Sequence, residues 1–227
     1  MFQIILKYGI IRKIVRNELP YTDIENVLQL IGGFLSNIND ECLDKIVLKE
    51  IINFLYNVVK TLYNNNNKIL RDSLWVISNI YLKDEELLNY FFNLGILKEI
   101  VDIIANKEHV IAREALFILN NYTISEMENG NKNSFNRLYG NNNNLDNVFR
   151  AILIFIEKNN PNDENSYENC YEILNNMFIF GSIVKVNGMN VIYNRFEVVG
   201  GKDKLNDLIN KIDEKMAIMF EKLLQYK

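Results

Sequence analysis

Two stretches of the chain carry the same pattern: RDSLWVISN at residues 71–79 and REALFILNN at residues 113–121. They align without a gap, 42 positions apart, with basic, acidic, small, leucine, aromatic and asparagine positions in the same order. Within each stretch, apolar residues recur at the spacing of one helix face. The alignment therefore predicts a repeated amphipathic helix, and a fixed period of this length is typical of helical repeat proteins.

Other markers give nearly the same period. Gly9 in KYGII and Gly95 in NLGIL are 86 positions apart, or two periods of 43 residues. A third copy of the helix lies near residues 170–176, where the string ILNN of residues 118–121 recurs. Its offset of 55 residues fits one repeat plus an insertion. That insertion is expected at 125–147, a polar, asparagine-rich stretch that we predict to be exposed and mobile.

The phase of the most N-terminal copy is open to two interpretations. Asn37 lies 42 positions before Asn79, whereas VLQLIGG at residues 27–33 matches more positions of the helix pattern and places Gly33 where the asparagine stands in later copies. The second phase is preferred because a helix pattern constrains more positions than one polar residue does. A backbone clamp would then be missing at Gly33.

The composition favours helices over strands. The 227 residues include only 2 Pro and 10 Gly, although many short strands would need many turns built from these residues. A helix that cannot bury its apolar face alone must stack on neighbouring copies. We therefore expect one all-α domain over residues 1–227, an armadillo-type right-handed superhelical solenoid of about four to five repeats.

Several functional classes lack support. His109 is the sole histidine and is expected in a loop between helices, and Cys42 and Cys170 belong to no metal or disulfide motif. We expect no enzyme, cofactor or metal. The formal net charge of −4 disfavours a general nucleic-acid binder. No apolar run has the length that spans a bilayer, and greasy runs such as 151–156 are expected to be buried helix turns. The cytoplasm and nucleus are the expected locations.

The repeated aromatic and asparagine positions suggest a peptide groove. Trp75 and Asn79 lie one helical turn apart, as do Phe117 and Asn121. Asparagine can bond the backbone of an extended peptide, and an aromatic wall can hold a lysine or arginine stem. Acidic residues at the rim complete the expected peptide-binding set: Asp72, Trp75, Ser78, Asn79, Glu114, Phe117 and Asn121. The alternative is structural, with the aromatic residues in the core and the asparagines as caps or inter-repeat bonds.

These motifs resemble the Trp-x-x-x-Asn repeats of importin-alpha, the adaptor that recognises nuclear localisation signals. The segment EVVGGKDKL at 197–205 is similar to the opening of that family's last repeat, and FEKLLQY at 220–226 resembles its final helix. The resemblance runs from about Phe2 to Tyr226 and covers the last four to five repeats of a family member. It departs at Phe117, which replaces tryptophan, and at Gln29, where the family usually carries arginine.

The resemblance implies a nuclear transport adaptor for basic signal peptides of cargo proteins, with an importin-beta-type carrier or an export receptor as a further partner. The matched residues would form the family's minor signal-binding groove. The chain is expected to be a partial or truncated member, since no basic importin-beta-binding segment and no major-groove repeats are recognisable. The alternative function is a non-transport armadillo scaffold for protein–protein interaction.

Overall fold

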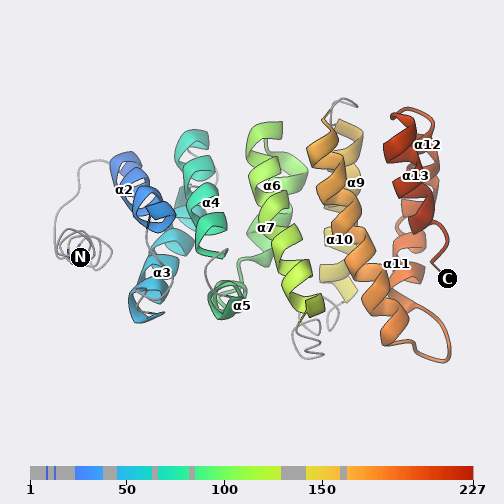
Figure 1. Ribbon diagram of the computed structural model, residues 1–227, viewed down its shortest axis with the longest axis horizontal. Helices are drawn as coiled ribbons and strands as arrows, with labels where there is room; N and C mark the ends of the chain where they lie inside the picture. Colours follow the sequence, from blue (N-terminus) through green and yellow to red (C-terminus); the bar gives the residue numbers. More distant parts are fainter. Residues whose placement is uncertain are drawn as a thin grey trace. The chain divides into compact units, whose positions relative to one another are not determined.

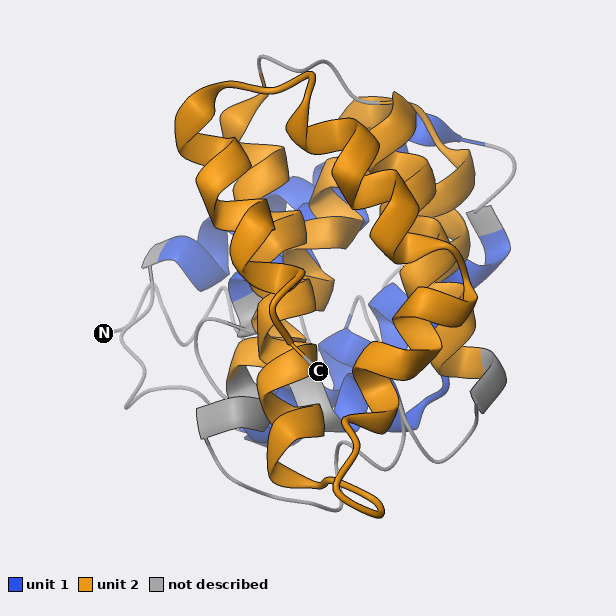
Figure 2. Cartoon of the chain, turned by 90° about the vertical axis from the view of Figure 1, so that its right-hand side faces the viewer, with its two compact units in different colours: residues 1–99 blue, residues 100–227 orange. Residues whose placement is uncertain are grey.

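The computed structural model describes residues 9, 13, 24–37, 45–62, 66–81, 85–128, 142–158 and 163–226. Every regular element in these ranges is an α-helix, and strand pairing there is limited to one isolated bridge, Val186 with Met189 (Figure 1). The all-α prediction is confirmed. The chain divides into two compact units, residues 1–99 and 100–227, coloured separately in Figure 2. Within the described residues, no helix is long and apolar enough to cross a membrane.

The helices that the structure describes in unit 1 are α2 (Ile24–Asn37), α3 (Lys45–Leu62), α4 (Asn67–Tyr81), α5 (Glu85–Asn93) and the start of α6. Helix α4 packs against α2 and α3. Leu28, Ile31 and Leu74 are fully buried between them. Asn66 caps α4, because its Oδ1 accepts the N–H of Ile69 at 3.1 Å. An asparagine run that reads as a loop thus supplies a helix start.

Unit 2 contains most of α6 (Leu97–Asn106), then α7 (His109–Glu128), α9 (Asn142–Lys158), α10 (Glu164–Ile183), α11 (Val191–Val198), α12 (Gly201–Ile209) and α13 (Glu214–Leu223). Helix α10 packs against α7 and α13, while α9 packs against α11 and α12. The rings of Phe149, Phe178 and Phe196 meet in this core, with centroids 5.1–6.2 Å apart. The run 151–156 is a turn of α9 that is buried except at Ile154, as predicted.

Two glycines mark equivalent corners. Gly95 precedes α6 with a φ of 90°, and Gly200 precedes α12 with a φ of 82°. This left-handed conformation is one that side chains with a Cβ rarely adopt, so glycine suits the sharp turn between consecutive helices. Gly9, paired with Gly95 by sequence, is instead helical. Local sequence similarity at Gly9 therefore does not reproduce the corner.

The predicted insertion at 125–147 is helical at both ends. Helix α7 continues through Glu128, since Glu126, Met127 and Glu128 are good helix formers. Helix α9 already begins at Asn142, because Leu145 is buried and anchors its first turns. Residues 129–141 lie outside the described residues, and their expected mobility stays a prediction.

His109 is the first residue of α7, so its expected place in a loop is wrong. Its ring stacks on Phe155 with centroids 5.5 Å apart, and its Nε2 lies 2.6 Å from Asp163 Oδ2. Asp163 in turn caps α10, accepting the N–H and hydroxyl of Ser166. Cys170 is buried in α10, and Cys42 lies outside the described residues.

Candidate functional site

The predicted site residues fall into two groups in different units. Asp72, Trp75, Ser78 and Asn79 belong to α4 of unit 1. Glu114, Phe117 and Asn121 belong to α7 of unit 2. Each group is therefore described within its own unit.

Trp75 lies on the surface of unit 1 and has a specific seat. Its side chain is 41% exposed, whereas Leu74 beside it is fully buried. The ring packs on the backbone of α2 at Gly32, where an added Cβ would lie 2.1 Å from the ring. The lack of a Cβ at Gly32 is what allows the indole to approach α2 this closely. The residue is thus a fixed aromatic surface rather than a core side chain.

Ser78 and Asn79 both turn to the same backbone carbonyl. The Ser78 hydroxyl and the Asn79 amide donate to the Trp75 carbonyl oxygen at 2.8 and 2.9 Å. Ser78 is buried, so it braces the helix instead of facing a ligand. Asn79 is half-buried, and its Oδ1 accepts no hydrogen bond from any residue that the structure describes. That oxygen is an available acceptor one turn from the indole.

Asp72 carries a charge that is already matched. Its Oδ1 lies 2.9 Å from Arg71 Nη2 and also accepts from Arg71 Nε at 3.1 Å. The pair is partly exposed, with side-chain exposures of 45% for Arg71 and 17% for Asp72. Surface pairs are worth roughly 0–1 kcal/mol, so a ligand cation can compete with Arg71 for this carboxylate.

The group in unit 2 opens onto a hollow between α7 and α10 with a volume of about 480 Å³. We call it the α7–α10 groove; its lining residues are Arg113, Glu114, Phe117, Asn165, Glu168, Asn169 and Glu172. Phe117 and Glu114 are half-buried and contribute the α7 wall. Asn121 is only 7% exposed and does not line the groove, although Phe117, one turn earlier on α7, does.

Four residues of the α10 wall were not predicted. Asn165, Glu168, Asn169 and Glu172 follow helical spacing on one face of α10. The signal was present, because aligning ILNN at 173–176 with 118–121 places Glu172 at the position of Phe117. Glu172 was missed because the prediction looked for an aromatic residue at this position of each copy, and this copy has a carboxylate there instead.

A buried amide links the two walls from behind. Asn120 is 3% exposed, and its Nδ2 donates to Glu172 Oε2 at 2.6 Å and to Asn169 Oδ1 at 3.0 Å. Its own Oδ1 is buried without a hydrogen-bond partner among the described residues. Asn176, one repeat after Asn121, donates to Thr123 Oγ1 at 3.3 Å. Asparagines of this helix thus form bonds between repeats, the structural alternative considered for the motif.

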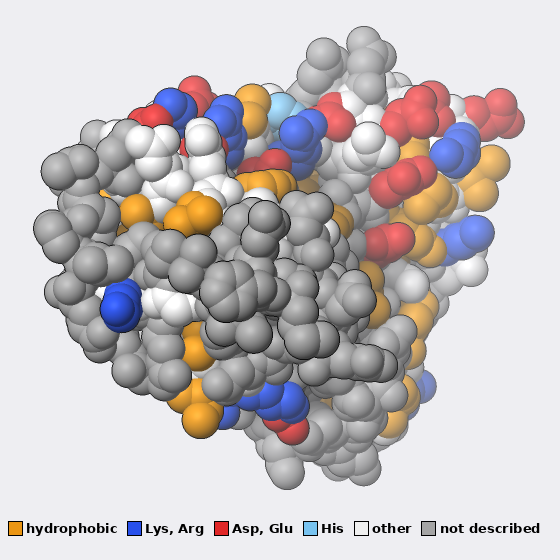
Figure 3. Space-filling view, turned by 60° about the vertical axis from the view of Figure 1, so that its left-hand side comes forward, with side chains coloured by type: hydrophobic (Ala, Val, Ile, Leu, Met, Phe, Trp, Pro, Cys, Tyr) orange, Lys and Arg blue, Asp and Glu red, His pale blue; other side chains and the backbone are white. Residues whose placement is uncertain are grey.

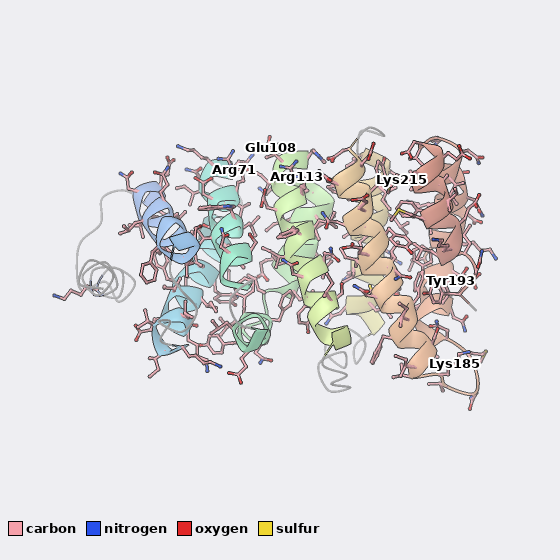
Figure 4. The ribbon with its side chains drawn as sticks, in the orientation of Figure 1. Arg71, Glu108, Arg113, Lys185, Tyr193 and Lys215 are labelled. Carbon is pink, nitrogen blue, oxygen red and sulfur yellow. The ribbon has the colours of Figure 1, made fainter. Side chains whose placement is uncertain are left out.

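Charges near the groove are of both signs. Lys215 of α13 lies 3.2 Å from Glu168 Oε1, whereas Glu172 forms no ion pair with a described residue. Figure 4 shows Arg113 and Lys215 at the same end of unit 2, with Lys185 at the other end. On the face shown in Figure 3, basic and acidic side chains are interspersed along the upper rim. No group of His, Cys, Asp and Glu in the described ranges has the arrangement of a metal site.

Comparisons with known proteins identify the fold. A designed armadillo repeat protein, YIII(Dq)4CqI, superposes with a TM-score of 0.60 at 16% identity, covering 96% of this chain and 82% of that chain. A second designed armadillo repeat protein, solved with the peptide (KR)4, has a TM-score of 0.42 at 15% identity, covering 89% of this chain and 92% of that chain. Neither a scan of protein-family models nor a search of curated protein sequences gave a match. The first likeness shows that this chain has an armadillo-repeat fold.

Proposed function

We propose that this protein is a non-catalytic interaction scaffold that binds an extended, basic segment of a partner protein. The observation that carries the proposal is the exposed indole of Trp75, seated on Gly32 one turn from the open acceptor of Asn79. An exposed aromatic beside a backbone-bonding amide suits an extended chain bearing lysine or arginine. The glutamates of the α7–α10 groove favour the same positive charge in unit 2.

The contributions expected at α4 are measurable. Each hydrogen bond of Asn79 to a peptide backbone is worth roughly 0.5–1.5 kcal/mol net. A cation over the Trp75 ring adds roughly 0.5–2 kcal/mol. Because 1.4 kcal/mol corresponds to about tenfold in affinity, removal of both side chains is expected to weaken binding by about fivefold to about three-hundredfold.

The test uses the single tryptophan of the chain as its reporter. A lysine- and arginine-rich peptide should change the emission of Trp75 on titration, and a peptide with glutamate in place of the basic residues should not. The variant Trp75→Ala with Asn79→Ala, followed with a labelled peptide, should lose binding while melting close to the parent. Ile46→Ala removes another exposed apolar side chain of unit 1 and should leave binding unchanged. Equal affinity of the double variant and the parent would refute the role of α4.

A second candidate is a nuclear transport adaptor of the importin-alpha type, acting in the cytoplasm and nucleus. The motifs around Trp75, Asn79 and Phe117 favour it, as does the similarity of segment 197–205 to the opening of that family's last repeat. The last repeat would then be the surface for an export receptor. A nuclear-localisation-signal peptide should bind more tightly than its scrambled version of the same charge. Equal binding of the two would favour a scaffold for basic segments outside nuclear transport.

A further inference from the structure

The α7–α10 groove combines features that suit one particular side chain. Its wall on α7 is the half-buried ring of Phe117, and its wall on α10 carries Glu168 and Glu172, four residues apart. Residues four apart lie one above the other on a helix, about 5–6 Å between their Cβ atoms. A cationic group placed against Phe117 would therefore face both carboxylates at once.

Glu172 is a carboxylate that is held in place but not neutralised. It accepts a hydrogen bond from the buried Asn120 at 2.6 Å, and no cationic side chain in the described ranges pairs with it. Glu168, by contrast, faces Lys215. An incoming cation finds no ion-paired partner on Glu172 among the described residues, whereas at Glu168 it competes with Lys215. Arg113 also lines the groove, on its α7 side.

The amides around Glu172 point to a ligand with several donors. Asn120 is 3% exposed and has a buried Oδ1 with no partner among the described residues. It also fixes Asn169, whose Oδ1 lies 3.0 Å from the Asn120 amide. Asn169 lines the groove beside Glu172, and an amide oxygen has two lone pairs, so the Asn169 Oδ1 can also accept from a ligand donor. Asn120 acts here as a positioning residue for Asn169 and Glu172.

A guanidinium meets these demands better than an ammonium. It presents five N–H donors in a rigid planar fork, and its plane stacks on an aromatic ring. An ammonium is a compact point charge that is more strongly hydrated and has no flat face. The separated carboxylates, the amide acceptors and the ring of Phe117 each favour the planar group.

We propose that the α7–α10 groove is a subsite that selects an arginine side chain over a lysine, with Glu172 as its principal carboxylate and Phe117 as its stacking wall. This inference rests on the proposed function, because it assigns one side chain of the bound segment. Its principal carboxylate, Glu172 of α10, lies outside the predicted site, whereas Phe117 of α7 belongs to it.

The test compares two eight-residue peptides of equal charge, one alternating arginine and serine and the other alternating lysine and serine. Because the basic residue recurs at every second position, several registers of each peptide place a basic side chain in the subsite. The parent should bind the arginine peptide more tightly, and Glu172→Gln should lower that affinity about tenfold, the effect of roughly one charge-assisted contact. The preference for arginine should largely disappear in this variant. Glu172 is exposed, so the substitution leaves the fold intact.

Two further variants sharpen the result. Glu221→Gln removes the same charge from an exposed position of α13 outside the groove and should preserve both the affinity and the preference. Asn120→Ala should reduce the preference for arginine while the affinity for the lysine peptide changes little, a readout that a merely structural role would not move. Equal binding of the two peptides by the parent, or an unchanged preference in Glu172→Gln, would overturn the proposal.

Failure of the subsite and failure of the scaffold function give different results. If both peptides bind equally and depend on Trp75, the scaffold stands and the arginine subsite is wrong. If neither peptide binds, the scaffold for basic segments is wrong, and the subsite falls with it.

Discussion

The repeated motif occurs on α4 in unit 1 and on α7 in unit 2, and the two copies present different surfaces. Trp75 is 41% exposed and lies on a glycine, whereas Phe117 is half-buried and faces the carboxylates of α10. Asn79 keeps an acceptor open, whereas Asn121 is 7% exposed. The difference arises from the neighbouring helix, since α2 offers bare backbone to Trp75 and α10 offers acidic side chains to Phe117. The repeated sequence determines that a helix forms, and the neighbouring helix determines which chemical groups the exposed face of that helix meets.

The largest expected effect separates the core of each copy from its surface. Leu74→Ala and Leu116→Ala truncate fully buried side chains and should each lower the free energy of unfolding by about 2–5 kcal/mol. Trp75→Ala and Phe117→Ala should cost clearly less, because both aromatic side chains are partly solvated. Urea unfolding of the four variants measures this. If Trp75→Ala lowers the free energy of unfolding as much as Leu74→Ala does, the indole is a core side chain and the surface assignment is wrong.

The next-largest expected effect is a difference in stability loss between the two asparagine variants. Asn121→Ala removes a buried amide and should cost about 1–3 kcal/mol of stability. Asn79→Ala removes a half-buried amide that bonds its own helix, and surface changes of that kind usually stay within about 0.5 kcal/mol. Thermal melts of the two variants compare them directly. Equal losses would mean that the two copies are structurally alike after all.

Neighbouring glycines of α2 provide a matched pair for the seat of Trp75. An added Cβ at Gly33 meets open space, so Gly33→Ala should stabilise the helix by up to about 1 kcal/mol. At Gly32 the same Cβ overlaps the indole and must push it into solvent, which offsets that gain. Tryptophan emission should shift to longer wavelength in Gly32→Ala alone. An identical spectrum in the two variants would show that the ring does not depend on Gly32.

The smallest expected effect is on the free energy of unfolding at acidic pH. Burial raises the pKa of Asp163, but hydrogen bonds from Ser166 and His109 outweigh it and hold the pKa below its ordinary value of 3.8. The stability that Asp163 contributes is therefore present above about pH 4 and is lost as the pH falls through the folded-state pKa. Helix α4, capped by the neutral Asn66, has no such dependence at its start. Asp163→Asn should flatten the acid limb of urea-unfolding stability, and an unchanged limb would contradict the assignment.

Periodicity sufficed for the helices because burial repeats with it. The aliphatic residues of 71–79 and 113–121 are all buried, and the copies at 27–33 and 170–176 are helical as well. The ends of helices were less predictable, since polar segments such as 125–128 and 142–144 extend helices that apolar residues anchor elsewhere along their length. Propensity and distant anchors decide such boundaries, and neither appears in a repeat alignment.

The composition of the site was predictable only where a motif repeats literally. Trp75 and Phe117 were identified by their shared position, but Glu172 occupies that position on α10 with different chemistry. The inward turn of Asn120 toward Glu172 depends on the packing of α10 on α7, which joins residues 52 positions apart. The need for glycine at position 32 likewise arises only from its contact with the Trp75 ring. Contacts between repeats, rather than patterns within them, determine the face.

The burial of Cys170 makes its thiol a kinetic probe for the opening of α10. The thiol is fully buried, and that burial raises the pKa of Cys170, so the reactive thiolate is scarce while the helix stays packed. Alkylation must then wait for α10 to separate from α7 and α13, and the labelling rate reports how often that opening occurs. A ligand held between α7 and α10 would slow this reaction in proportion to its occupancy. Mass spectrometry of the peptide that contains Cys170 would follow the mass that alkylation adds.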